Sequence, residues 1–244
     1  MKISLTFLLL LTITVSYCQD LAAIDKKLAN LYGNIPDSYS DKQKDARMDL
    51  FEKLLLKYTT QVPKTIDYPF KRLANCPLIY ISTSEDGNFR TYSIDYNRQQ
   101  SMPYFYNVYQ FRANGKVMSK KIPREGNIGP DYTYYEIHDM VLNGKTYYFA
   151  QRTAFGELTN PFSIKFFSIE NNQLKDDVKL IQTDKGLVNV LECGKVDALS
   201  DDTTKYKINY NKPAQSFSIP ILEKGKITKK RVTYKFNGKY FVKI

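Results

Sequence analysis

Apolar and polar residues follow two different patterns along the chain. Between residues 20 and 62, apolar side chains recur every three or four positions, which is the spacing of one face of an α-helix. From about residue 66, short runs rich in Tyr, Phe, Ile, Val and Thr are separated by clusters of Gly, Asn, Asp and Pro, as in strands joined by turns. The sequence predicts a helical N-terminal segment over 19–64, followed by an antiparallel β domain over 65–244.

Two helices are expected in the N-terminal segment. In the first, a single apolar stripe is formed by Leu21, Ile24, Leu28 and Leu31. The second begins with a capping box, because Ser40 takes the N-cap position and Gln43 follows three residues later. Its apolar face is expected to comprise Ala46, Leu50, Phe51, Leu54 and Tyr58.

The β domain is expected to be a mainly β sandwich or barrel-like meander of about 10–13 antiparallel strands. No helical stripe interrupts the strand-like runs, so a parallel sheet with crossover helices is not expected. The candidate strands cover 78–83, 88–96, 104–113, 116–122, 132–142, 145–153, 162–170, 173–182, 186–193, 204–210, 215–222, 227–236 and 239–244.

The tripeptide Asn-Gly-Lys occurs three times between strand-like runs, beginning at Asn114, Asn143 and Asn237. Asn-Gly is the strongest short signal for a β-hairpin, because both residues accept the positive φ of a tight turn. For the last hairpin we expect a three-residue loop, because this places Tyr234 opposite Tyr240 and keeps the apolar side chains on one face. Gly238 would then adopt the left-handed conformation.

Residues 1–18 have the pattern of a secretory signal peptide. Lys2 supplies the positive charge, and residues 5–15 form an apolar run too short to span a membrane. Cleavage is expected near Cys18-Gln19, which would give a secreted or periplasmic protein. The alternative is a lipoprotein anchored to a membrane through Cys18.

The formal net charge is +11 at pH 7, and much of it lies near the C-terminus, where residues 216–244 carry eight basic side chains and one acidic one, Glu223. In an exported protein we expect such a charge to meet an anionic glycan or an acidic protein of the envelope, and not nucleic acid. A membrane partner is expected only if Cys18 is lipidated. The basic candidate binding residues are Lys229, Lys230, Arg231, Lys235 and Lys239. Alternatively, these lysines keep the sheet soluble and protect its edges.

His138 is the only histidine of the chain. Tyr134, Glu136 and His138 alternate along one expected strand, so they should share a face, and we include them among the candidate binding residues. Asp139 would point to the opposite face, so no catalytic residue is assigned. A carboxylate-dependent hydrolase would need two acids facing each other, and spacing does not select a pair from Glu136, Asp139, Glu157, Glu170, Asp176 and Asp177.

Three cysteines and one histidine argue against a zinc site. The sequence also contains no glycine-rich phosphate-binding loop and no nucleophile-elbow serine motif. No metal or cofactor is therefore expected. After signal cleavage Cys76 and Cys193 would remain, and the sequence leaves two alternatives: one disulfide between them, or two buried thiols.

The rhythm of residues 146–149, 166–174 and 234–242 resembles that of uncharacterised secreted β-rich proteins of Bacteroidetes-type bacteria. The resemblance covers roughly the last hundred residues and implies an envelope location, without assigning any functional residue. The aromatic and basic residues of the strands favour a non-enzymatic binding or structural module that meets a glycan or protein through its strand faces. The alternatives are a carboxylate-dependent hydrolase and a lipid-anchored surface protein.

Overall fold

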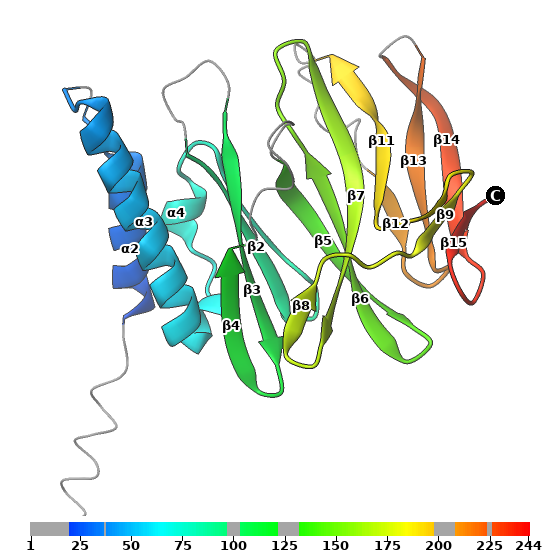
Figure 1. The fold of residues 1–244 in the computed structure, drawn as a ribbon, viewed down its shortest axis with the longest axis horizontal. Coiled ribbons are helices and arrows are strands. Elements are labelled where there is room, and N and C mark those ends of the chain that lie inside the picture. The colour runs from blue at the N-terminus through cyan, green and yellow to red at the C-terminus, as the bar shows by residue number, and fades with distance from the viewer. Residues whose placement is uncertain (1–19, 37, 97–102, 122–131, 198–207, 224–225) are drawn as a thin grey trace, which may run out of the picture. The chain divides into compact units, whose positions relative to one another are not determined.

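The computed structural model describes residues 20–36, 38–96, 103–121, 132–197, 208–223 and 226–244. The chain divides into two compact units, Met1–Pro77 and Leu78–Ile244. The first is helical and the second is built from β-strands (Figure 1). Residues 1–19, with the expected signal peptide, lie outside the described residues. Among the described residues, no helix is both long and apolar enough to cross a membrane.

The helical unit contains the two expected helices, α2 (Leu21–Gly33) and α3 (Asp41–Gln61), followed by the short η1 (Pro63–Ile66) and α4 (Lys71–Ala74). The capping box of α3 is confirmed, because Gln43 Oε1 accepts a hydrogen bond from the Ser40 backbone N–H at 2.9 Å. Tyr32 and Phe51 are fully buried, and their ring centroids lie 5.3 Å apart between α2 and α3.

Of the expected apolar face of α3, Phe51 is buried, Leu54 and Tyr58 are half-buried, and Ala46 and Leu50 are exposed. The buried residues of this helix are Met48, Phe51, Leu55 and Thr59, while Leu50 is 45% exposed. Thr59 can replace an apolar residue on the buried stripe because its hydroxyl donates to the Leu55 carbonyl at 2.8 Å. The helix therefore packs through a stripe that simple apolar spacing did not identify.

A buried carboxylate holds the short helix α4 within the helical unit. Asp25 is 2% exposed and accepts hydrogen bonds from the backbone N–H groups of Arg72 at 3.0 Å and Leu73 at 2.9 Å. These are two of the N–H groups that a helix leaves without an internal partner at its N-terminus. Residues 71–74 thus fold with the helices and not with the β-strands.

The second unit is mainly β and almost entirely antiparallel, which confirms the expected fold class as a sandwich of three sheets. The amino-terminal sheet consists of β1 (Ile79–Thr83), β2 (Phe89–Asp95), β3 (Phe105–Ala113) and β4 (Lys116–Lys121). The middle sheet consists of β5 (Thr133–Leu142), β6 (Lys145–Thr153), β7 (Thr159–Glu170), β8 (Gln173–Lys175) and β11 (Val190–Asp197). The carboxy-terminal sheet consists of β9 (Ile181–Thr183), β10 (Gly186–Val188), β12 (Asn209–Asn211), β13 (Ser216–Glu223), β14 (Lys226–Phe236) and β15 (Phe241–Lys243).

The middle sheet lies between the other two sheets of this unit (Figure 1). One of its faces joins a core with the carboxy-terminal sheet, to which Phe149, Phe166 and Phe217 contribute. Its other face joins a separate core with the amino-terminal sheet, to which Phe89 and Phe167 contribute. Because successive strand residues point to opposite faces, Phe166 and Phe167 enter different cores, and the run around them is apolar on both sides.

Two buried cations of the middle sheet have partners inside the fold. Lys165 is 2% exposed, and its ammonium lies 3.6 Å from a carboxylate oxygen of Asp176. Arg152 is 5% exposed, donates from Nε to Ser163 Oγ at 2.8 Å, and stacks with its guanidinium 3.9 Å from the centroid of the Tyr132 ring. These contacts offset the cost of removing the charges from water.

The expected hairpins at Asn114-Gly115 and Asn143-Gly144 are confirmed. Ala113 pairs with Lys116 and Leu142 with Lys145, which leaves two-residue loops. All four turn residues have positive φ, between 48° and 76°. A third turn of this kind, with Asn-Asn in place of Asn-Gly, joins β7 to β8 at residues 171–172, with φ of 50° and 62°.

The expected register of the last hairpin was wrong. Tyr234 pairs with Lys243 and Phe236 with Phe241, so the loop has four residues, 237–240, and not three. Phe241 is fully buried in the core beside Phe236, which fixes this register in place of one that would bury Tyr240. Gly238 does have a positive φ of 94°, and the Asn237 side chain stabilises the loop by accepting from the Lys239 and Tyr240 N–H groups at 3.0 and 2.9 Å.

Two expected strands are each divided into two. Residues 173–182 form β8 of the middle sheet and part of β9 of the carboxy-terminal sheet, and residues 186–193 are shared in the same way between β10 and β11. The chain crosses between sheets in both segments, and the sequence pattern did not reveal these crossings. Residues 204–207 of the expected strand over 204–210 lie outside the described residues, and β12 begins at Asn209.

We expect Phe149→Ala to destabilise the β unit by about 3–5 kcal/mol, because it leaves a cavity in a core of aromatic rings. Phe149 is fully buried, with ring centroids 5.1 Å from Phe217 and 5.6 Å from Phe166. Urea unfolding measures the change. The control is Leu158→Ala, which should alter the free energy of unfolding by less than about 0.5 kcal/mol, since Leu158 is 81% exposed. Equal effects of the two changes would contradict this account of the core.

Candidate functional site

The basic candidate residues lie along β14 and the turn that follows it. Lys229, Lys230, Lys235 and Lys239 are exposed. We call these four lysines together with Arg231 the basic ridge. Val232, Tyr234 and Phe236 of the same strand pack on the core, so Arg231 and Lys235 point to the outer face of the carboxy-terminal sheet.

Hydroxyl side chains of the neighbouring strand β13 accompany the basic ridge. Ser216 pairs with Lys235 across the strands, and Ser218 pairs with Thr233. Arg231 is held against the sheet because its Nε and Nη2 atoms donate to the side chain and backbone carbonyl of Ser218 at 2.9 and 2.7 Å. The ridge thus combines one cation held by hydrogen bonds and four exposed lysines with short hydrogen-bonding side chains.

The ridge has little negative charge around it. Glu223 is the sole acidic residue of β12 to β15 in the part of the chain that the structure describes, and it lies 3.4 Å from the Lys230 ammonium. Both side chains of that pair are more than half exposed, so the pair is worth well under about 1 kcal/mol.

The expectation that Tyr134 shares a face with Glu136 and His138 was wrong. Tyr134 pairs with Arg152 and Glu136 with Gln151, so Tyr135 is an extra residue in β5 and forms a β-bulge. Tyr134 is 2% exposed and packs in the core with the amino-terminal sheet, whereas His138 faces Tyr210 of the carboxy-terminal sheet. A bulge of one residue reverses the face of every side chain beyond it.

Glu136 and His138 do lie together. The two ring nitrogens of His138 each lie 3.5 Å from a carboxylate oxygen, Nδ1 from Glu85 and Nε2 from Glu136. Glu85 also accepts from the Lys212 ammonium at 3.1 Å, and this hydrogen bond is the main reason that the pKa of Glu85 is lowered. With a carboxylate near each nitrogen, His138 joins segments that are distant along the chain.

This cluster connects all three sheets of the β unit. Glu85 lies in the turn after β1, His138 in β5 and Lys212 in the turn after β12. Lys212 also donates to Asp139 at 2.7 Å. The structure does not place the cluster on the outer face that carries Arg231 and Lys235, because Glu136 and His138 point from the middle sheet towards the inner side of the carboxy-terminal sheet.

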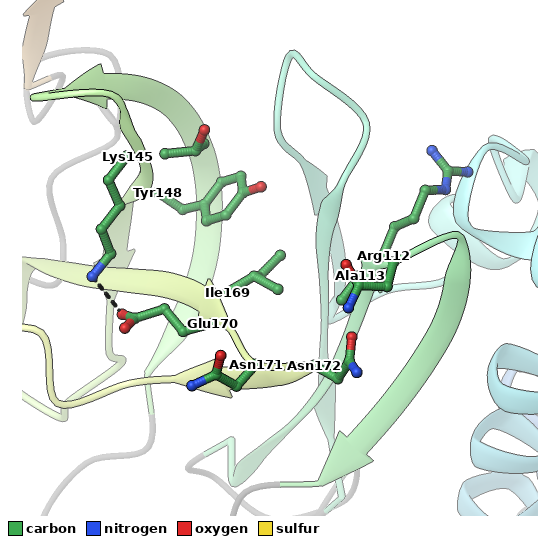
Figure 2. Close-up of a pocket in the computed structure, with 10 residues that line it drawn as sticks. Arg112, Ala113, Lys145, Tyr148, Ile169, Glu170, Asn171 and Asn172 are labelled. Carbon is green, nitrogen blue, oxygen red and sulfur yellow. Dashed lines mark ion pairs between the residues drawn. The ribbon is translucent and has the colours of Figure 1, made fainter.

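A pocket of about 580 Å³ lies where three hairpins of the β unit turn, and we call it the turn pocket (Figure 2). It is lined by Arg112, Ala113, Asn114, Lys145, Thr146, Tyr148, Ile169, Glu170, Asn171 and Asn172. This pocket was not predicted from the sequence. The only signal for it in the sequence was the repeated Asn-Gly turn. The sequence alone does not show that the turns of β3–β4, β5–β6 and β7–β8 lie together at one end of the β unit.

An ion pair crosses one side of the turn pocket. Lys145 Nζ lies 2.7 Å from Glu170 Oε1, and Ser168 also donates to the Glu170 carboxylate. The hydrogen bonds from Lys145 and Ser168 lower the pKa of Glu170. Desolvation is the largest single influence on Lys145 and would lower its pKa, but the hydrogen bonds and charge interactions with Glu170 and Tyr147 together outweigh it, and the pKa of Lys145 is raised.

Several acids considered for hydrolysis are paired with lysines. Asp139 is bound to Lys212, Glu170 to Lys145 and Asp176 to Lys165. Within the described ranges, no group of three or more His, Cys, Asp or Glu side chains is arranged to hold a metal ion.

The two cysteines belong to different units, and both are thiols in the structure. Cys76 Sγ lies 3.5 Å from the Arg72 carbonyl oxygen within the helical unit. Cys193 lies in β11, where burial raises the pKa of its thiol. A disulfide between Cys76 and Cys193 stays a prediction.

We expect Lys145→Met to remove a small stabilisation that depends on pH. The pKa of Glu170 is lowered in the folded state from its ordinary 4.5, so the stabilisation is present above pH 4.5 and is lost as the pH falls through the lowered value. Because the two side chains are 42% and 37% exposed, we expect less than about 1 kcal/mol. Urea unfolding of both proteins between pH 7 and pH 3 should show the two stabilities converging at low pH. A constant difference would mean that the pair does not contribute.

Comparisons with other proteins do not add to this picture. No protein-family model matches the chain. A search of curated proteins finds no significant match either. A function for the chain therefore has to be inferred from its geometry and charges.

Proposed function

We propose that the chain is an exported binding module of the cell envelope that binds an anionic glycan along the basic ridge. The supporting observation is the row of cations on and beside the outer face of β14, beside the hydroxyls of Ser216 and Ser218. Arg231 and Lys235 lie on one face about 13 Å apart, and Lys229 and Lys230 lie in the segment before them, where the pairing of β14 with β13 shifts register. A linear polyanion fits such a row, because its acidic groups recur along the chain and each can meet a cation in turn.

Edge protection does not account for the whole ridge. Lys235 pairs with Ser216 of β13 on one side and Val242 of β15 on the other, so it lies inside the sheet and guards no open edge. Repulsion among neighbouring cations costs stability, and that cost is offset when an anionic ligand binds.

A glycan is favoured over a lipid surface by the hydroxyls beside the cations. Ser216, Ser218 and Thr233 supply hydrogen-bonding groups that match sugar hydroxyls. Binding to a lipid surface usually combines basic charge with apolar side chains that enter the bilayer. Among the described residues of β13 to β15 and the C-terminus, Ile244 is the one large apolar side chain that is exposed.

The lowered pKa of Glu170 favours a binding role over hydrolysis. A carboxylate-dependent hydrolase needs one acid that stays protonated near neutral pH, and hence a raised pKa. Glu85 and Glu170 have lowered pKa values instead, because each accepts hydrogen bonds from a lysine.

We expect the double variant Lys229→Glu/Lys235→Glu to bind a polyuronate or a sulfated polysaccharide at least about tenfold more weakly than the original protein. Affinity is measured by isothermal titration calorimetry at several salt concentrations, and binding by the original protein should weaken as salt rises. The matched control, Lys42→Glu/Lys116→Glu, makes the same charge change at exposed positions elsewhere. Equal losses in both variants would indicate attraction to net charge alone, and binding only to anionic lipid vesicles would contradict the glycan.

We expect the mature protein to begin at Gln19. The apolar run over 5–15 and the short side chain of Cys18 fit cleavage at that point. Intact-mass spectrometry of the protein from its natural cell envelope distinguishes the alternatives, because lipidation at Cys18 would add the mass of acyl chains. An N-terminus that retains residues 1–18 would contradict export by this route.

A further inference from the structure

We propose that the turn pocket is a second binding site, and that it takes a neutral sugar unit. The pocket and the basic ridge lie on different strands and turns of the β unit, so this inference does not rest on ligand binding at the ridge. Its volume of about 580 Å³ falls within the range of small-molecule sites, roughly 300–1,000 Å³.

The lining of the pocket includes the apolar side chains of Ile169 and Ala113. Figure 2 shows Ile169 between the Lys145–Glu170 pair on one side and Ala113 on the other, with the Tyr148 ring above it. Tyr148 is 3% exposed, and its hydroxyl donates to Asp86 at 3.1 Å, which fixes the ring. A sugar ring has an apolar face of C–H groups that packs on such a surface.

The rim of the pocket is polar, with groups that match sugar hydroxyls. Asn114, Asn171 and Asn172 are exposed, and each amide carries both donors and an acceptor. A sugar hydroxyl also donates and accepts, so neighbouring hydroxyls can bond to one amide through both functions. Thr146 adds a hydroxyl to the same lining.

The charges that face the pocket cancel. Lys145 and Glu170 neutralise each other at 2.7 Å, and the guanidinium of Arg112 extends away from the other labelled residues in Figure 2. An anionic ligand would have to compete with Glu170 for Lys145, and a cationic ligand would compete with Lys145 for Glu170. A neutral ligand can accept from the ammonium and donate to the carboxylate without separating them.

The turns hold the rim in place before a ligand arrives. Asn114, Asn171 and Asn172 have φ of 48°, 50° and 62°, the left-handed conformation of tight hairpin turns. A site that is already ordered loses less conformational entropy on binding. Glycine is the residue that can replace these asparagines without strain, so the amide can be removed while the turn is kept.

The test measures binding of cellobiose, maltose and N,N′-diacetylchitobiose to the full chain by ligand-observed NMR and calorimetry, with galacturonic acid as the charged comparison. We expect at least one neutral disaccharide to bind, and binding to be about five- to tenfold weaker in Asn172→Gly and in Asn114→Gly. Glu170→Gln provides a variant outside the turns and should weaken binding as well, because it removes an acceptor and releases Lys145.

The controls separate this site from the basic ridge. Lys229→Glu/Lys235→Glu should bind the neutral disaccharide as the original protein does, and Asn172→Gly should bind the polyanion as the original protein does. Thermal unfolding of the glycine variants should remain two-state with a similar midpoint. The inference is overturned if none of the three disaccharides binds, if both glycine variants keep full affinity, or if galacturonic acid binds more tightly than the neutral sugars.

Discussion

The β unit depends on a middle sheet that is buried on both faces. A sheet that is buried on both faces requires apolar side chains at successive positions of its strands. This explains why Phe166 and Phe167 are adjacent and enter two separate cores. It also requires that each buried cation finds a partner, as Lys165 does in Asp176 and Arg152 does in Ser163 and the Tyr132 ring. The strands of this sheet are therefore occupied by packing, and the surfaces left for ligands are outer faces and turns.

The two proposed ligand surfaces follow from that division. The basic ridge uses the outer face of a sheet whose inner face is committed to a core, so strand alternation alone sends Arg231 and Lys235 outward. The turn pocket lies at the ends of hairpins. The asparagines there adopt the positive φ that the turns require, and they also expose their side-chain amides to solvent. In both places a side chain required for folding sits beside one that is available for binding.

Much of the architecture was predictable because strands and tight turns depend mainly on the local sequence. Asn114-Gly115 and Asn143-Gly144 specify their hairpins through positive φ, a property of two residues. The bulge at Tyr135, the packed stripe of α3 and the pairing of Phe236 with Phe241 depend on which neighbour each element meets, so local pattern misjudged them. The turn pocket was unpredictable for the same reason, since Asn114 and Asn172 meet only once the order of strands is known. The charge of the ridge, by contrast, is visible in the sequence.

Strand β15 has a consequence for the order in which the molecule assembles. It covers only Phe241–Lys243, yet it lies between β14 and β9, and its pairing with β9 is parallel. Residue 181 therefore stays without this neighbour until residue 241 has been synthesised. The carboxy-terminal sheet can close only after β15 has been synthesised, and such distant pairings form slowly. The sheet that covers one face of the middle sheet is therefore complete only when segments far apart along the chain have met.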